Sequence, residues 1–160
     1  MNHACIHVDS PVGRLRLTAN ARALIDIAFD DAGGGQGENQ PRTATEHPVL
    51  VLAARELEEY FGGERKAFTI PCEPAGTDFE RQVWRALAAI PMGETRSYTD
   101  IARAVGRERA VRAVGGANHR NPLAIVVPCH RVIGRAGELR GYAGGLDKKA
   151  WLLRHEGAIA

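Results

Sequence analysis

Cysteine is scarce in this sequence, and its three copies, Cys5, Cys72 and Cys129, stand in different local settings. An odd number of cysteines without a shared spacing argues against a disulfide framework and favours a reducing compartment. Long apolar runs are missing as well. No stretch approaches the roughly eighteen residues of a membrane span, and the N-terminus lacks the charged and then apolar pattern of a signal peptide. We therefore expect a soluble protein in the cytoplasm.

Net charge is also small, at +2 over 160 residues, of which 44% are hydrophobic and 25% are charged. This composition allows a normal core, either in one compact unit or in two small lobes. The charge is unevenly spread, because residues 96–140 hold nine arginines, no lysine and only three acidic residues. A basic block in a nearly neutral protein is typical of a surface that binds phosphate, with an ordinary solvated surface as the alternative.

The first half of the chain alternates short apolar segments with turns. Residues 14–19 alternate arginine and leucine as a half-buried strand does, and their neighbours predict two further strands in an antiparallel meander. A polar loop at 30–48 precedes an amphipathic helix. His3, Cys5 and His7 share one side of the first strand, but no fourth ligand follows at a recognisable spacing, so we expect no metal there. The predicted segments are strands at 4–8, 14–19 and 23–29, a helix at 49–61, extended chain at 67–70 and a linker at 71–76.

The second half opens with a capping box, in which Thr77 is followed three residues later by Glu80. This pattern predicts a helix that ends before Pro91. Two short helices follow, joined by a glycine-containing turn, which is typical of a helix-turn-helix. The predicted ranges are 99–105 and 109–117 for this pair and 148–155, capped by Asp147, for a last helix.

The second helix of the pair has almost no protruding side chains. Ala110, Val111, Ala113 and Gly115 are all small, and Arg112 stands alone among them. Small residues allow a helix to enter a narrow groove of a ligand. Close packing of this helix within the protein is the alternative.

A candidate reactive thiol, Cys129, follows the apolar run 123–127. The thiolate is the nucleophilic form of cysteine, and cationic or hydrogen-bonding neighbours make it easier to form. His130 and Arg131 are candidates for that help. Neighbours on an extended strand point to opposite faces, so Cys129 and His130 could cooperate only in a turn or at a helical start. A buried structural cysteine beside a surface histidine is the alternative.

The residues Val126 to Gly134 closely resemble a signature of the O6-alkylguanine-DNA alkyltransferase family, and their Pro-Cys-His-Arg-Val core is highly specific to it. The likeness covers roughly residues 77–157 and extends more loosely to residues 9–13. It implies an α+β fold in two lobes. A small antiparallel sheet with a helix forms a supporting, ribonuclease H-like lobe at 1–74. A mainly helical, winged-helix-like lobe at 75–160 carries the helix-turn-helix and the active site.

The resemblance also assigns the chemistry. Cys129 takes an alkyl group from O6 of guanine and, as a further substrate, from O4 of thymine. In the family, a histidine sustains the thiolate through a water and a glutamate orients the histidine, and His130 and Glu156 match these positions. Asn121 matches an asparagine that braces the two halves of the lobe, with a satisfied turn asparagine as the alternative. The thioether product is not hydrolysed, so each molecule acts once, without metal or organic cofactor.

The implied partner is duplex DNA, bound by a monomer, from which the damaged base is extruded into a pocket. Arg112 fills the gap in the base stack, while Tyr98 promotes rotation of the 3′ phosphate and donates to the guanine ring. The helix docks in the minor groove through Ala110, Val111, Ala113 and Gly115. The base pocket is formed by Val132, Tyr142, Ala143, Gly144 and Lys149.

Within that pocket, the backbone N–H of Ala143 meets O6, and the carbonyls of Cys129 and Val132 accept from the exocyclic amine. A solvated charge in the first turn of a helix is the alternative for Lys149. The sequence departs from the family at Val111, where alanine is frequent, and at Ala143, where serine or glycine is often seen.

Two other classes of protein fit parts of this pattern. A cysteine hydrolase would use Cys129 and His130 but would need an oxyanion hole and would turn over. A protein that only binds lesions would keep Tyr98 and Arg112 without needing Cys129. The presence of that cysteine favours the transferase.

Overall fold

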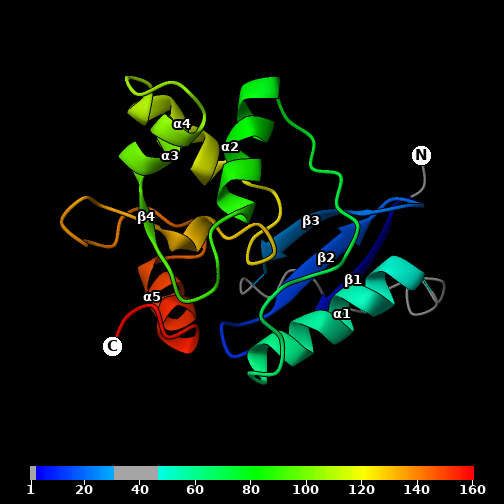
Figure 1. Cartoon of the computed structure of the whole chain (residues 1–160). Coiled ribbons are helices and arrows are strands. Elements are labelled where there is room, and N and C mark those ends of the chain that lie inside the picture. Colours follow the sequence, from blue (N-terminus) through cyan, green and yellow to red (C-terminus); the bar gives the residue numbers. More distant parts are fainter. Residues whose placement is uncertain (1–2, 31–46) are drawn as a thin grey trace. The chain divides into compact units, whose positions relative to one another are not determined.

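The computed structural model describes residues 3–30 and 47–160, and the chain divides into two compact units, Met1–Ala75 and Gly76–Ala160. In the described residues, the first unit joins a three-stranded sheet to a helix, and the second is mainly helical (Figure 1). Most of the loop predicted at 30–48 lies outside the described residues. Within the two described ranges, no helix is long and apolar enough to cross a membrane.

The sheet of the first unit is an antiparallel meander in the order β1-β2-β3. Its middle strand has the predicted alternation, because Leu15 and Leu17 are fully buried while Arg16 is exposed. The turn before it closes where the N–H of Gly13 donates to the carbonyl of Ser10 at 3.0 Å. The strands are β1 (Ala4–Val8), β2 (Leu15–Ala19) and β3 (Leu24–Phe29).

Helix α1 (Pro48–Phe61) lies along this sheet (Figure 1). Its buried face includes an unpredicted carboxylate, Glu56, which is 1% exposed. The Glu56 carboxylate accepts from the backbone N–H of Thr69 at 2.7 Å and from the Thr69 hydroxyl. That N–H is therefore taken by a side chain, and no strand forms over the predicted extended segment 67–70. An isolated parallel bridge between Leu24 and Cys72 joins the following residues to the sheet instead.

The second unit begins at the predicted capping box, which is confirmed. The Thr77 hydroxyl accepts from the Glu80 N–H at 3.1 Å, and the Glu80 carboxylate accepts from the Thr77 N–H at 2.9 Å. Helix α2 (Asp78–Ala88) follows and buries one apolar face. From that face, the indole of Trp84 donates to the carbonyl of Ala117 at 2.9 Å, which ties α2 to a later helix.

The predicted helix-turn-helix is formed by α3 (Tyr98–Ala104) and α4 (Val111–His119). The second helix begins two residues later than predicted. The N–H of Ala110 closes a turn on the carbonyl of Arg107 at 2.9 Å, and the backbone of Ala110 is not helical. The helix then runs two residues further than predicted, to His119.

The last helix, α5 (Leu146–His155), begins earlier than predicted, and Asp147 is not its cap. Gly145, with φ of 101°, turns the chain into the helix and stands at the cap position. This conformation suits glycine because it has no Cβ. Two short parallel strands, β4 (Arg96–Ser97) and β5 (Val132–Ile133), complete the unit, with the 3-10 helix η2 (Cys129–Arg131) just before β5.

Candidate active site

The chain approaches Cys129 through a compact loop that Asn121 holds in shape. The Asn121 side chain accepts from the N–H of Leu123 at 2.9 Å and donates to the carbonyl of Val127 at 2.8 Å. Cys129 then begins η2, so it and His130 lie in a tight helical turn. A turn of this kind is the geometry in which we expected Cys129 and His130 to be able to cooperate. Asn121 both satisfies its own turn, as the alternative reading had it, and joins the two ends of this loop.

The thiol of Cys129 is almost fully buried. Burial raises its pKa, while a hydrogen bond from the Asn121 side chain and the charge of Lys149 lower it, so that the net shift is upward. The resting group is therefore a neutral thiol at pH 7. A nucleophilic thiolate requires that a nearby base takes its proton.

His130 is the candidate base, and it is completely buried against Glu156. Its Nε2 lies 2.7 Å from a carboxylate oxygen of Glu156. Because a carboxylate only accepts, Nε2 carries the proton and Nδ1 keeps its lone pair. Burial lowers the pKa of His130, although the hydrogen bond and charge of Glu156 raise it in part. Among the described residues, Nδ1 has no hydrogen-bond partner, so this nitrogen can accept a proton.

The sequence suggested that Arg131 helps the thiol, but the Arg131 side chain binds Glu156 instead. Its Nε and Nη2 donate to the two carboxylate oxygens of Glu156 at 2.8 and 3.0 Å. Its Nη1 donates to the carbonyl of Ile90 at 2.6 Å. Residues 25 positions apart in sequence thus form a buried, bidentate ion pair. Glu156 is the C-cap residue of α5, where the helix dipole disfavours an anion, and Arg131 offsets that cost.

Lys149 is fully buried, so its alternative reading as a solvated charge is wrong. Its Nζ donates to the carbonyl of Val132 at 2.6 Å and to the carbonyl of Arg140 at 2.5 Å. Burial lowers the pKa of Lys149 to about 8, against a smaller opposing effect of Cys129. One ammonium group therefore joins β5 to the loop that precedes α5.

Two tyrosines lie near the thiol. Burial first, and then the charge of Cys129, raises the pKa of both Tyr98 and Tyr142. Tyr98 is the first residue of α3, and its hydroxyl donates to the carbonyl of Arg140 at 3.4 Å. The ring of Tyr142 meets that of His130 edge-on at 6.5 Å. A backbone bond from Gly145 to Tyr142 closes a turn over the two remaining pocket candidates, Ala143 and Gly144.

Apart from Tyr98 on α3, the predicted DNA-binding residues lie on α4 or just before it. Arg112 and Ala113 are exposed, and a Cβ added to Gly115 would meet open space. Val111 and Ala110 are partly exposed at the start of the helix. The opposite face of α4 packs into the unit through Val114, Ala117 and Asn118. The outer face therefore presents small residues around a single long cation.

Asn118 is a polar residue near the thiol that the sequence reading missed. It is 4% exposed, and its amide nitrogen lies 3.5 Å from the carbonyl of Cys129. Its amide oxygen is buried and has no partner in the described part of the chain. Asn118 follows Val114 by four residues and Ala117 by one, so it shares their side of the helix. This spacing is the signal that could have revealed it. The helix that carries Arg112 outward thus touches the Cys129 backbone on its inner side.

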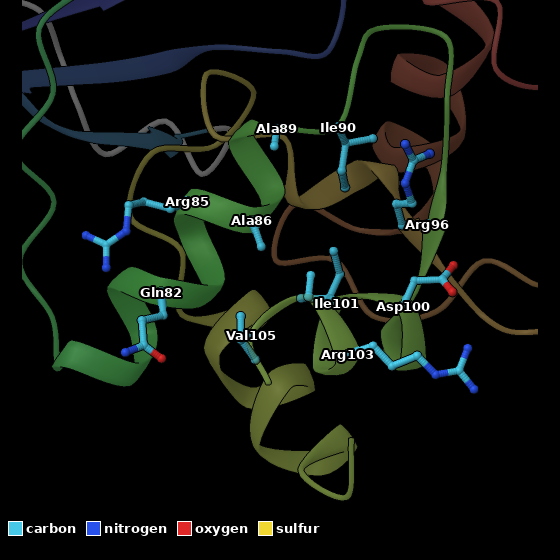
Figure 2. Close-up of a pocket in the computed structure, with 11 residues that line it drawn as sticks. Gln82, Arg85, Ala86, Ala89, Ile90, Arg96, Asp100, Ile101, Arg103 and Val105 are labelled. Atoms are coloured by element: carbon cyan, nitrogen blue, oxygen red, sulfur yellow. The ribbon is translucent and has the colours of Figure 1, made fainter. Parts of the chain in front are cut away.

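A groove of about 930 Å³ lies between α2 and α3 (Figure 2). Ile90 and Ile101 in its lining are almost completely buried. None of its lining residues belongs to the predicted site. No group of three potential metal ligands occurs among residues 3–30 and 47–160, and His7 lies 2.9 Å from Asp30. The groove is lined by Gln82, Arg85, Ala86, Ala89, Ile90, Arg96, Asp100, Ile101, Arg103, Ala104 and Val105.

A helix-turn-helix in the same unit as a buried cysteine, base and carboxylate defines a DNA-binding protein with a candidate nucleophilic thiol. The chain belongs to the O6-methylguanine DNA methyltransferase family. Residues 78–158 match the family model for the DNA-binding domain of 6-O-methylguanine DNA methyltransferase, and residues 4–74 match the model for its ribonuclease-like domain.

Individual relatives agree with this membership. The chain is 47% identical over 150 residues to a methylated-DNA–protein-cysteine methyltransferase of Methanosarcina barkeri, covering 93% of this chain and 94% of the relative. A constitutive Bacillus subtilis protein of the same name is 57% identical over 116 residues, which cover 70% of each chain. The crystal structure of Mycobacterium tuberculosis OGT in complex with DNA has a TM-score of 0.83 and 42% identity, over 97% of this chain and 93% of that one. These likenesses confirm the predicted α+β fold.

Proposed function

We propose that this protein repairs DNA by direct reversal, moving an alkyl group from O6 of guanine in duplex DNA to Cys129 in one irreversible turnover. The observation that carries the proposal is the buried Cys129, next to the neutral, Glu156-bound His130 and in the unit that holds the helix-turn-helix. The relatives named methylated-DNA–protein-cysteine methyltransferase support it. O4-alkylthymine is a second proposed substrate.

In the proposed reaction, the Cys129 proton passes through a water to Nδ1 of His130, the buried nitrogen with a free lone pair. Glu156 stabilises the imidazolium that forms. The thiolate then attacks the alkyl carbon, a carbon–sulfur bond forms and the bond to O6 breaks. The electron pair stays on the guanine, where the N–H of Ala143 donates to O6. The hydroxyl of Tyr98 exchanges its bond to the carbonyl of Arg140 for one to the guanine ring. The proton that left Cys129 finally balances the one that guanine carries on N1 and that the alkylated base lacks.

Access to the base follows from the exposed face of α4. The small residues of this face allow the helix to approach the minor groove closely, and Arg112 is long enough to enter the base stack. Extruding a base costs a few kcal/mol, which contacts of Arg112 and Tyr98 offset. The carbonyls of Cys129 and Val132 accept from the exocyclic amine in this proposal. The carbonyl of Val132 keeps a second lone pair beside its bond from Lys149.

The remaining parts of the proposal concern the whole chain. Residues 75–160 bind DNA and carry out the transfer, and residues 1–74 support them. The protein acts as a monomer, without a cofactor, in the cytoplasm, where a free thiol stays reduced.

The test is incubation with excess O6-methylguanine duplex, followed by intact-mass measurement and peptide mapping. We expect one added methylene on the peptide that contains Cys129, no further turnover, and no label on Cys5 or Cys72. Cys129→Ala should bind DNA and repair nothing, while Cys5→Ala and Cys72→Ala should behave as the parent. Repeated turnover would instead indicate a hydrolase, and binding without modification would indicate a lesion-binding protein.

A further inference from the structure

The carboxylate of Glu156 receives three donors from two consecutive residues. His130 Nε2 lies 2.7 Å from one oxygen, and Arg131 donates through Nε and Nη2 at 2.8 and 3.0 Å. The side chains of His130 and Glu156 are completely buried, and that of Arg131 is 7% exposed. Removing one member of such a buried pair leaves a charge without a partner. The role of Arg131 therefore reaches the histidine through the shared carboxylate.

We propose that Arg131 is a positioning residue for alkyl transfer: its guanidinium fixes the Glu156 carboxylate and supplies the counter-charge that keeps His130 neutral and able to accept the thiol proton. This inference rests on the proposed function. Arg131 itself touches neither the thiol nor the base pocket in the contacts described above.

The electrostatic step depends on which protonation state of His130 the surroundings favour. A buried carboxylate alone against an imidazole stabilises the imidazolium, and an imidazolium cannot take the proton of a thiol. Among the charged groups around His130, Glu156 raises its pKa, while Arg131 and then Lys149 lower it, in addition to the larger lowering by burial. Arg131 donates to the very carboxylate that raises this pKa. Without it, His130 would hold a proton at higher pH.

The geometric step depends on the fork of the guanidinium. Two parallel donors fix the plane of the carboxylate, which a single ammonium group cannot do. The third nitrogen, Nη1, donates to the carbonyl of Ile90, which lies just after α2 (Figure 2). Glu156 at the end of α5 is therefore held from η2, which is itself attached to the segment that follows α2. This chain of contacts fixes the orientation of the His130 ring and therefore the direction of its Nδ1.

The experiment measures single-turnover transfer to Cys129 on O6-methylguanine duplex between pH 5 and 9. In Arg131→Lys and Arg131→Met, we expect the acidic limb of the rate profile to move to higher pH, by about one unit for Met and less for Lys. The ratio of the rates at pH 8 and pH 6 within each variant is the readout. A general loss of packing changes both rates together and leaves this ratio unchanged.

The matched control is Arg131→Met combined with Glu156→Gln, which removes both buried charges. Its His130 ring should titrate at the parent pKa or below, because no carboxylate remains to stabilise the imidazolium, although transfer itself is slow without Glu156. NMR titration of the His130 ring should show the same order of pKa values. If Arg131→Met alone fails to fold, Arg131→Lys and the double variant, which leaves no unpaired buried charge, still decide the question.

The outcomes separate this inference from the proposed function. If the parent protein is not methylated at Cys129, the proposed function fails. If the parent is methylated but the acidic limb stays in place in both Arg131 variants, the transfer reaction stands and Arg131 is only a structural ion-pair partner.

Discussion

Among the residues that the structure describes, each unit buries one glutamate at a helix, and the two differ in their partners. Glu56 in α1 is bound by the backbone and hydroxyl of Thr69 and lies 3.4 Å from Arg65. Glu156 at the end of α5 is bound by Arg131 and by His130. Both carboxylates have an arginine, but only Glu156 also binds a histidine, whose imidazole can take up and release a proton. A buried carboxylate therefore stabilises a fold or directs a proton, according to the residue on its other side.

The largest effect we expect separates these two glutamates by rate. Glu156→Gln should slow single-turnover transfer by about 100-fold, because the imidazolium of His130 loses its stabilising charge. The pKa of the Cys129 thiol in the protein should rise, so that the rate reaches its plateau at higher pH. Affinity for duplex DNA should hardly change. An unshifted pH profile would return Glu156 to a purely structural role.

A second, smaller effect tests the outer face of the second unit. Tyr98→Phe and Arg112→Ala should reduce repair of duplex DNA by about tenfold or more, since extruding a base costs a few kcal/mol. Both changes should have much less effect on the reaction with the free modified base, which needs no extrusion. Rates on the two substrates, measured side by side, give the comparison. Equal losses on both would remove the assignment to base extrusion.

The third effect concerns Glu56 and is one of stability. Glu56→Gln should lower the free energy of unfolding of the first unit by about 1–3 kcal/mol, because charge-assisted bonds to Thr69 are weakened. Urea unfolding followed by circular dichroism measures this. The transfer rate per titrated Cys129 should equal that of the parent. A tenfold slower rate would show that Glu56 affects the transfer reaction as well as the stability of the fold.

The smallest effect compares exposed arginines of the two units. Duplex affinity should fall steeply as salt rises, because phosphate contacts release bound counterions. Arg109→Gln should reduce the slope of log affinity against log salt by about one if Arg109 contacts a phosphate. Arg22→Gln, in the first unit, is the matched control and should leave the slope unchanged. Fluorescence anisotropy of a labelled duplex at several salt concentrations measures both.

Local patterns in the sequence predicted much of the fold. The capping box at Thr77 and Glu80 and the alternation around Leu15 and Leu17 depend on residues within one turn or one strand. Their outcome could be predicted without knowledge of distant contacts. The start of α4 was two residues off, because the non-helical turn that ends at Ala110 has no strong sequence signal.

The candidate site was predicted to a smaller extent, and through resemblance rather than spacing. Cys129 and His130 stand in a specific motif, but the contact of Arg131 with Glu156 joins residues 25 positions apart. The burial of Lys149 depends on the carbonyls of Val132 and Arg140, which no sequence pattern places near it. Side-chain pairing across distant segments is set by tertiary packing. The roles predicted for these residues await the experiments above.

The bond from Trp84 to the carbonyl of Ala117 also has a spectroscopic consequence. The indole of Trp84 is buried in α2, while Ala117 belongs to the helix whose other face carries Arg112. Indole emission responds to the polarity and hydrogen bonding around the ring. A small displacement of α4 on a duplex should therefore change the emission of Trp84. We expect this emission to report DNA docking without a label, from a residue that takes no part in the proposed reaction.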